Sequence, residues 1–73
     1  MKKSIYTKKY RLILQKLTRA RKELGYTQED VAKLLDKHQS YISKIEKGER
    51  RLDIIELMEF ANIYKKSINY FID

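Results

Sequence analysis

The sequence predicts a compact all-α domain of four to five helices. Three observations favour this class: apolar residues recur at spacings of three and four along the chain, proline is absent, and only two glycines occur. No stretch shows the apolar-polar alternation that a half-buried strand requires. A chain of 73 residues is enough for one small core, so we expect residues 1–73 to form a single domain.

Composition and charge narrow the functional classes. Cysteine is absent, which excludes disulfides and thiolate metal sites. The net charge is +7, and residues 1–24 carry nine Lys or Arg against one Glu (9 − 1 = +8). Such a basic domain favours a polyanion, namely DNA, RNA or an anionic membrane surface, although lysine-rich helix faces can also be simply solvated. We find no signal peptide and no apolar run of ~18 residues, and we therefore expect a cytoplasmic protein.

The first two predicted helices are delimited by their caps. The first ends at Gly25, because glycine adopts left-handed backbone at little cost. Thr27 begins the second helix, with Asp30 three residues later as a variant of the capping box. The first helix is amphipathic, with Tyr10, Ile13, Leu14, Leu17, Arg21 and Leu24 recurring at spacings of three and four, and the second buries Val31, Ala32, Leu34 and Leu35.

Three further helices are expected in the second half of the chain. One runs from about Gln39 to Lys47, with Ile42 and Ile45 facing inward and Gly48 closing it. Asp53 caps the next, and Ser67 caps a short last turn that runs to the end of the chain. The inner face of the helix after Asp53 is expected to be Ile54, Leu57, Met58 and Ala61.

The helix from Thr27 and the helix from Gln39 are separated by only three residues. This spacing is typical of a helix-turn-helix unit, which would span about residues 27–47. In such units the second helix lies in the DNA major groove, with its first residues at the base edges. The polar start of this helix fits that role, because Gln39 can pair with adenine and Ser40 permits close approach. The sequence therefore predicts binding to double-stranded DNA.

Three motifs also resemble a known family. ARKELGYTQEDVAKLL, QSYISKIEKGERRLD and IIELMEFA occur in this order between about Leu12 and Phe71. Together they are similar to the lambda-repressor-like (Cro/Xre-type) helix-turn-helix transcriptional regulators. The resemblance implies a fold of four or five helices, a palindromic operator as partner, and a homodimeric regulator, here expected to be a repressor.

The resemblance also implies roles for individual residues. Positions matching the family's base contacts are Gln39, Ser40, Ser43 and Lys44, and those matching its phosphate contacts are Gln28, Lys47, Arg50 and Arg51. Gln28 is in addition expected to brace the first residue of the recognition helix. Arg21 and Glu46 match an internal ion pair between the first and third helices, whereas from the residues alone both would be surface charges.

A dimer seam is expected at the C-terminal segment. Its large apolar residues exceed what so small a monomer can hide, and exposed apolar patches usually mark an interface. We therefore expect Ile68, Tyr70, Phe71 and Ile72 at or near the seam. The N-terminal helix is the competing seam, but the density of Lys and Arg would make two copies repel.

Three positions depart from the family pattern. Asp36 stands at a turn position usually filled by glycine, and Asp tolerates left-handed backbone at modest cost. His38 stands where a more effective Ser or Thr cap is common. Lys65-Lys66 replaces a usual Gly-Val, so the joint before the last segment could be shifted.

Catalysis, metal binding and cofactors are not expected. His38 has no second His or Cys beside it, and no two carboxylates are marked as an acid/base pair. The alternative function is an antitoxin or anti-repressor module that acts mainly by binding another protein on the same fold. The sequence does not separate restriction–modification controllers, phage repressors and antitoxins.

Overall fold

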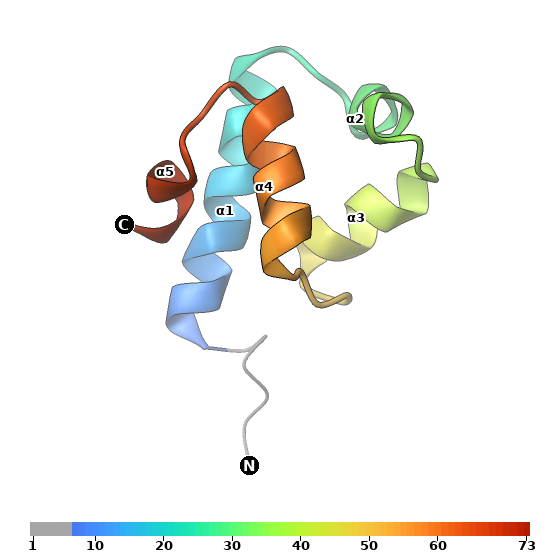
Figure 1. Cartoon of the computed structure of the whole chain (residues 1–73). Helices are drawn as coiled ribbons and strands as arrows, with labels where there is room; N and C mark the ends of the chain where they lie inside the picture. The colour runs from blue at the N-terminus through green and yellow to red at the C-terminus, as the bar shows by residue number, and fades with distance from the viewer. Residues whose placement is uncertain (1–6) are drawn as a thin grey trace.

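The computed structural model describes residues 7–73, which fold into five α-helices without a strand in that range. The helices are α1 (Lys8–Glu23), α2 (Gln28–Leu35), α3 (Gln39–Lys47), α4 (Ile54–Ile63) and α5 (Ile68–Ile72). In Figure 1, α1 and α4 lie in the middle, with α2 and α3 on one side and α5 on the other. The predicted all-α class is confirmed. The basic residues Lys2 and Lys3 lie outside the described range.

Two of the helix starts are fixed by reciprocal caps. Thr27 accepts a hydrogen bond from the Asp30 backbone N–H at 3.0 Å, and the Asp30 carboxylate accepts one from the Thr27 N–H at 2.8 Å. Asp53 and Glu56 form the same capping box at α4. Both pairs satisfy N–H groups that a helix start leaves without partners. Ser67 is the N-cap residue of α5 as expected, but its side chain makes no cap hydrogen bond.

The first four helices end in one common backbone motif. A residue with positive φ follows each of them: Gly25 (75°), Asp36 (56°), Gly48 (78°) and Lys65 (58°). The next N–H then bonds back into the last turn, as Lys66 N–H does to the Ala61 carbonyl at 3.0 Å. Asp36 therefore keeps the turn as expected. Lys65 takes the conformation of the usual glycine, so the joint after α4 is not shifted.

Replacing Lys65 with glycine is expected to stabilise the domain by about 1 kcal/mol. Left-handed backbone brings the Cβ of Lys65 close to its own carbonyl, and glycine removes that strain at some cost in unfolded-chain entropy. The thermal midpoint should rise by about 4–8 °C for a domain of this size. Lys65→Ala is the matched control, because it removes the side chain but keeps the Cβ and should leave the midpoint nearly unchanged.

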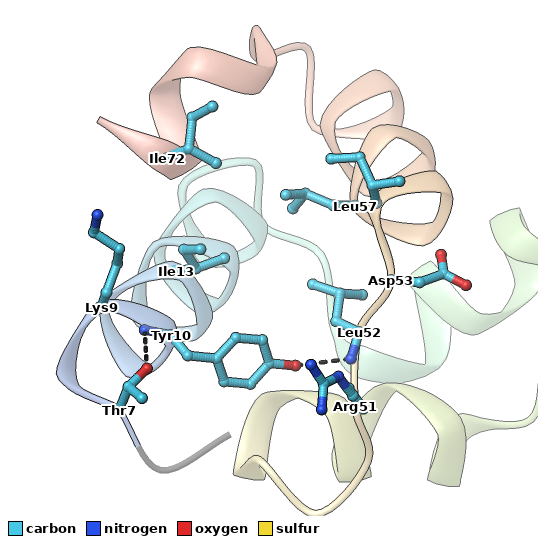
Figure 2. Close-up of a pocket in the computed structure, with 10 residues that line it drawn as sticks. Thr7, Lys9, Tyr10, Ile13, Arg51, Leu52, Asp53, Leu57 and Ile72 are labelled. Atoms are coloured by element: carbon cyan, nitrogen blue, oxygen red, sulfur yellow. Dashed lines mark hydrogen bonds between the residues drawn. The ribbon is translucent and has the colours of Figure 1, made fainter. Parts of the chain in front are cut away.

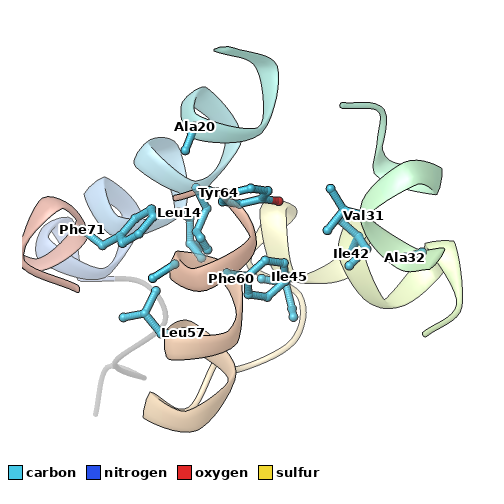
Figure 3. Packing of buried hydrophobic residues seen from close by; sticks show 12 residues of the cluster. Leu14, Ala20, Val31, Ala32, Ile42, Ile45, Leu57, Phe60, Tyr64 and Phe71 are labelled. Carbon is cyan, nitrogen blue, oxygen red and sulfur yellow. The ribbon is translucent and has the colours of Figure 1, made fainter. Parts of the chain in front are cut away.

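The core is formed by residues from all five helices (Figure 3). On α4 the buried face consists of Leu57, Phe60 and Ala61, and it continues to Tyr64. The prediction for this helix is partly wrong, because Ile54 and Met58 are 59% and 53% exposed. Leu34 on α2 was also expected to be buried and is exposed. The buried hydrophobic residues are Leu14, Leu17, Ala20, Val31, Ala32, Ile42, Ile45, Leu57, Phe60, Ala61, Tyr64 and Phe71.

The short helix α5 packs on α1. Phe71 is 1% exposed and belongs to the core of the monomer, and its expected place at or near a dimer seam stays a prediction. Lys66 lies 4.6 Å from the centre of the Tyr70 ring and forms an ion pair with Glu23 at 3.5 Å. Lys16 Nζ donates to the Asp73 carbonyl at 3.4 Å. The two lysines therefore add surface contacts between α5 and α1 to the buried contact of Phe71, which the sequence pattern did not indicate.

One buried polar atom of the core has no hydrogen-bond partner within residues 7–73. It is the Tyr64 hydroxyl, and burial raises the pKa of this phenol. Because an unpaired buried hydroxyl costs ~1–3 kcal/mol, Tyr64→Phe is expected to increase the free energy of unfolding by about 1 kcal/mol or more. Urea unfolding measures the change. Tyr10→Phe is the control and should destabilise, because the Tyr10 hydroxyl accepts a hydrogen bond from Leu52 N–H at 2.7 Å.

Candidate DNA-binding surface

Helices α2 and α3 form the predicted helix-turn-helix, and α3 presents two contrasting faces. Ile42 and Ile45 are fully buried and attach α3 to the core. The polar residues at spacings of three and four lie on the other side, since Ser40, Lys44 and Lys47 are exposed and Ser43 is half-buried. The residues expected to contact bases therefore share one accessible face, together with the exposed Gln39 at the start of the helix.

A chain of hydrogen bonds links the start of α3 to the interior. Gln39 Nε2 donates to Gln28 Oε1 at 2.7 Å, and Gln28 Nε2 donates to Glu46 Oε1 at 3.0 Å. Glu46 also accepts two hydrogen bonds from Arg21, from Nε at 2.7 Å and from Nη2 at 3.1 Å. The structure thus places Gln28 against Gln39, where the family resemblance puts a bracing glutamine.

This chain fixes the orientation of the Gln39 side chain. Because the Glu46 carboxylate only accepts hydrogen bonds, the Gln28 amide must turn its NH₂ group toward Glu46 and its oxygen toward Gln39. Gln39 then uses one N–H for Gln28 and keeps one N–H and its carbonyl oxygen free. These two groups match the N7 acceptor and N6 donor that adenine presents in the major groove.

Arg21 and Glu46 form an ion pair between α1 and α3. Their side chains are only 10% and 8% exposed, and hydrogen bonding to Glu46 raises the pKa of Arg21. Arg21 also donates from Nη1 to the Tyr26 carbonyl at 2.9 Å. The arginine therefore joins α1, α3 and the loop before α2, and neither partner is a surface charge.

The cations expected to contact phosphates differ in their surroundings. Lys47 and Arg51 are exposed, and within the described residues neither forms an ion pair. Arg50 is instead held in place: its Nη1 donates to Glu56 at 2.9 Å and to the Arg51 carbonyl at 3.0 Å. Its side chain nevertheless remains 43% exposed, which leaves a fixed cation at the edge of α3.

Tyr41 contacts both Arg50 and the core at this edge of α3. Its ring stacks on Phe60 at 6.4 Å, and its hydroxyl donates to Glu56 at 2.9 Å. Burial, followed by the hydrogen bond to Glu56, raises the pKa of Tyr41 to about 12. Lys37 and Arg50 lie 5.1 and 4.7 Å from the ring centre, within cation–π range.

Nowhere between residues 7 and 73 do three or more His, Cys, Asp or Glu side chains gather in a way that could hold a metal ion. Over the same range, each helix is too short or too polar to span a bilayer.

Comparison with known proteins identifies the family. A helix-turn-helix family model of the Cro/C1 type matches residues 17–71, which is most of the chain and includes α2, α3 and α4. Curated proteins and solved structures gave no significant match. The family consists of DNA-binding regulators. The chain belongs to the lambda-repressor-like, Cro/C1-type helix-turn-helix family.

Proposed function

We propose that the protein is a sequence-specific transcriptional repressor that binds a palindromic operator as a homodimer. The observation that carries this proposal is the hydrogen-bonded chain from Arg21 to Gln39, which ends on an accessible helix face. A side chain held in one orientation presents a fixed donor and acceptor to the base edge, and it loses less freedom on binding than a mobile one. The two copies of α3 would enter half-sites about one helical turn apart, roughly 34 Å.

The residues on and around α3 divide into two roles in this proposal. Base contacts come from Gln39, Ser40, Ser43 and Lys44. Phosphate contacts come from the remaining N–H of Gln28 and from Lys47, Arg50 and Arg51. Arg50 acts as a fixed cation, because Glu56 and Tyr41 already position it. Phosphate contacts set affinity and register, whereas base contacts set the sequence preference.

Gln39→Ala is expected to relax the preference at one base pair and to cost ~1–3 kcal/mol on the best site. The site is first selected from random duplexes with the wild-type protein, and binding is then measured by fluorescence anisotropy. Arg51→Ala is the contrasting variant: it should weaken binding to all duplexes similarly and reduce the salt slope by about one. If Gln39→Ala kept both wild-type affinity and wild-type preference, α3 would not be the reading helix.

A further inference from the structure

A patch of exposed apolar side chains covers parts of α1, α4 and α5. Seven large hydrophobic residues are exposed within residues 7–73, and five of them lie on these three helices. We call this group the α1–α4–α5 face; its members are Leu12 (45% exposed), Ile54 (59%), Ile55 (60%), Met58 (53%) and Ile72 (50%). Single exposed apolar residues are ordinary, but a contiguous group of this kind usually marks an interface.

Two adjoining hollows connect three members of this face, Leu12, Ile54 and Ile72. The first, of about 370 Å³, lies between the start of α1, the start of α4 and the end of α5. Its wall includes Tyr10, Ile13, Leu57 and Ile72 (Figure 2), and Ile54 also lines it. The second, of about 360 Å³, is lined by Leu12 and again by Ile13 and Ile72. Ile13 and Ile72 line both hollows and thus connect Ile54 on α4 with Leu12 on α1, while Ile55 and Met58 are exposed on α4 outside the hollows.

The charges beside the face are of opposite sign on its two sides. On α1, six basic residues remain outside the core once the buried Arg21, which pairs with Glu46, is set aside, and the single Glu23 is paired with Lys66. The α4 sequence IIELMEFANI contains no Lys or Arg; Glu56 is already paired with Arg50, so the acidic groups left on this side are the exposed Glu59 and the capping Asp53. In a two-fold symmetric dimer the same surface of both copies forms the interface. The α1 helix of one copy can then contact α4 of the other. The repulsion expected between two basic N-terminal helices then becomes attraction.

We propose that a second copy of this chain covers the α1–α4–α5 face, with α4 of each copy placed against α1 of its partner. This inference rests on the homodimer of the proposed function. It places the dimer interface at residues other than most of those expected from the sequence. Of the four residues expected at the seam, Ile72 remains central, Phe71 belongs to the core, and Ile68 and Tyr70 are partly buried against it. Ile54, Ile55 and Met58 take their place. A second copy fits better than a different protein because apolar contact and opposite charges occur on the same self-complementary surface.

Sedimentation equilibrium of the full chain tests the seam. Ile54→Glu and Met58→Glu should each weaken self-association by about tenfold or more, because a charge would be buried in an apolar contact. Ile54→Glu should leave the fold intact, since an acidic residue is favourable at the start of a helix. Leu34→Glu is the matched control: Leu34 is equally exposed, at 54%, but lies on α2 outside the face, and its dimer should persist.

A charge exchange tests the arrangement of the two copies. Lys9, which lines both hollows, and Glu59, which is exposed on α4, should oppose each other across the axis. Lys9→Glu should weaken the dimer, and adding Glu59→Lys in the same chain should restore it. A wild-type monomer both free and on DNA, or a dimer that tolerates Ile54→Glu and Met58→Glu, would overturn the proposal. Failure of the exchange to restore the dimer would overturn the placement of α4 against α1.

The seam and the proposed function can fail separately. Ile54→Glu keeps α3 intact, so at low salt it should still bind a single half-site with the wild-type base preference. If the wild-type protein were a monomer whose base preference depended on Gln39, the assignment of α3 as the reading helix would be supported and the proposed dimer interface would be wrong. If Gln39→Ala had no effect on DNA binding while Ile54→Glu split the dimer, the proposed dimer interface would be supported and the assignment of α3 as the reading helix would be wrong.

Discussion

Replacing Glu46 with alanine is expected to lower the free energy of unfolding by about 3–5 kcal/mol. The change leaves the Arg21 guanidinium charged at a position where its side chain is only 10% exposed, and it removes the acceptor of both hydrogen bonds that Arg21 donates to Glu46. At about 0.05–0.15 kcal/mol per residue, a domain of this size has only about 4–11 kcal/mol of stability in total. Urea unfolding followed by circular dichroism should therefore show a variant that is largely or wholly unfolded at moderate temperature.

A double variant separates the effect of breaking the ion pair from the effect of losing side-chain volume. Arg21→Met with Glu46→Leu replaces both charges by apolar side chains and leaves neither unpaired. This variant should be clearly more stable than Glu46→Ala, because the main cost of breaking a buried pair is the solitary charge. A Glu46→Ala protein within about 1 kcal/mol of wild type would mean that water reaches Arg21 and that the pair is not shielded.

The elements predicted correctly are those that local chemistry specifies. Thr27 with Asp30 marks the start of α2, because a capping box needs only residues three positions apart. The polar start of α3 followed by Ile42 and Ile45 shows which side of that helix is buried. The contact between Arg21 and Glu46 joins residues 25 positions apart, and no periodicity indicates it. It could be expected only from the family resemblance.

The buried face of α4 could not be read from its sequence. The segment IIELMEFANI has apolar residues on nearly every side, so several stripes fit a helical period equally well. Packing against the neighbouring helices decides which face is buried: Phe60 and Tyr64 lie in the core, whereas Ile54 and Met58 are exposed. The contact of Tyr41 with Glu56 was equally hidden, because it depends on how the loop after Gly48 returns the chain to α3.

Phe71→Ala is expected to destabilise the monomer by about 3–5 kcal/mol, which separates folding from assembly at the C-terminus. The ring of Phe71 is 1% exposed and meets Tyr70 edge-on at 4.9 Å, so alanine leaves a cavity beneath α5. Ile72→Ala is the neighbouring control: its side chain is 50% exposed, and its loss should change monomer stability little while weakening the dimer. Urea unfolding at several protein concentrations measures both effects, because only the dimer contribution depends on concentration. A Phe71→Ala protein of wild-type stability would show that α5 is not part of the monomer core, and Phe71 would then be available for the seam after all.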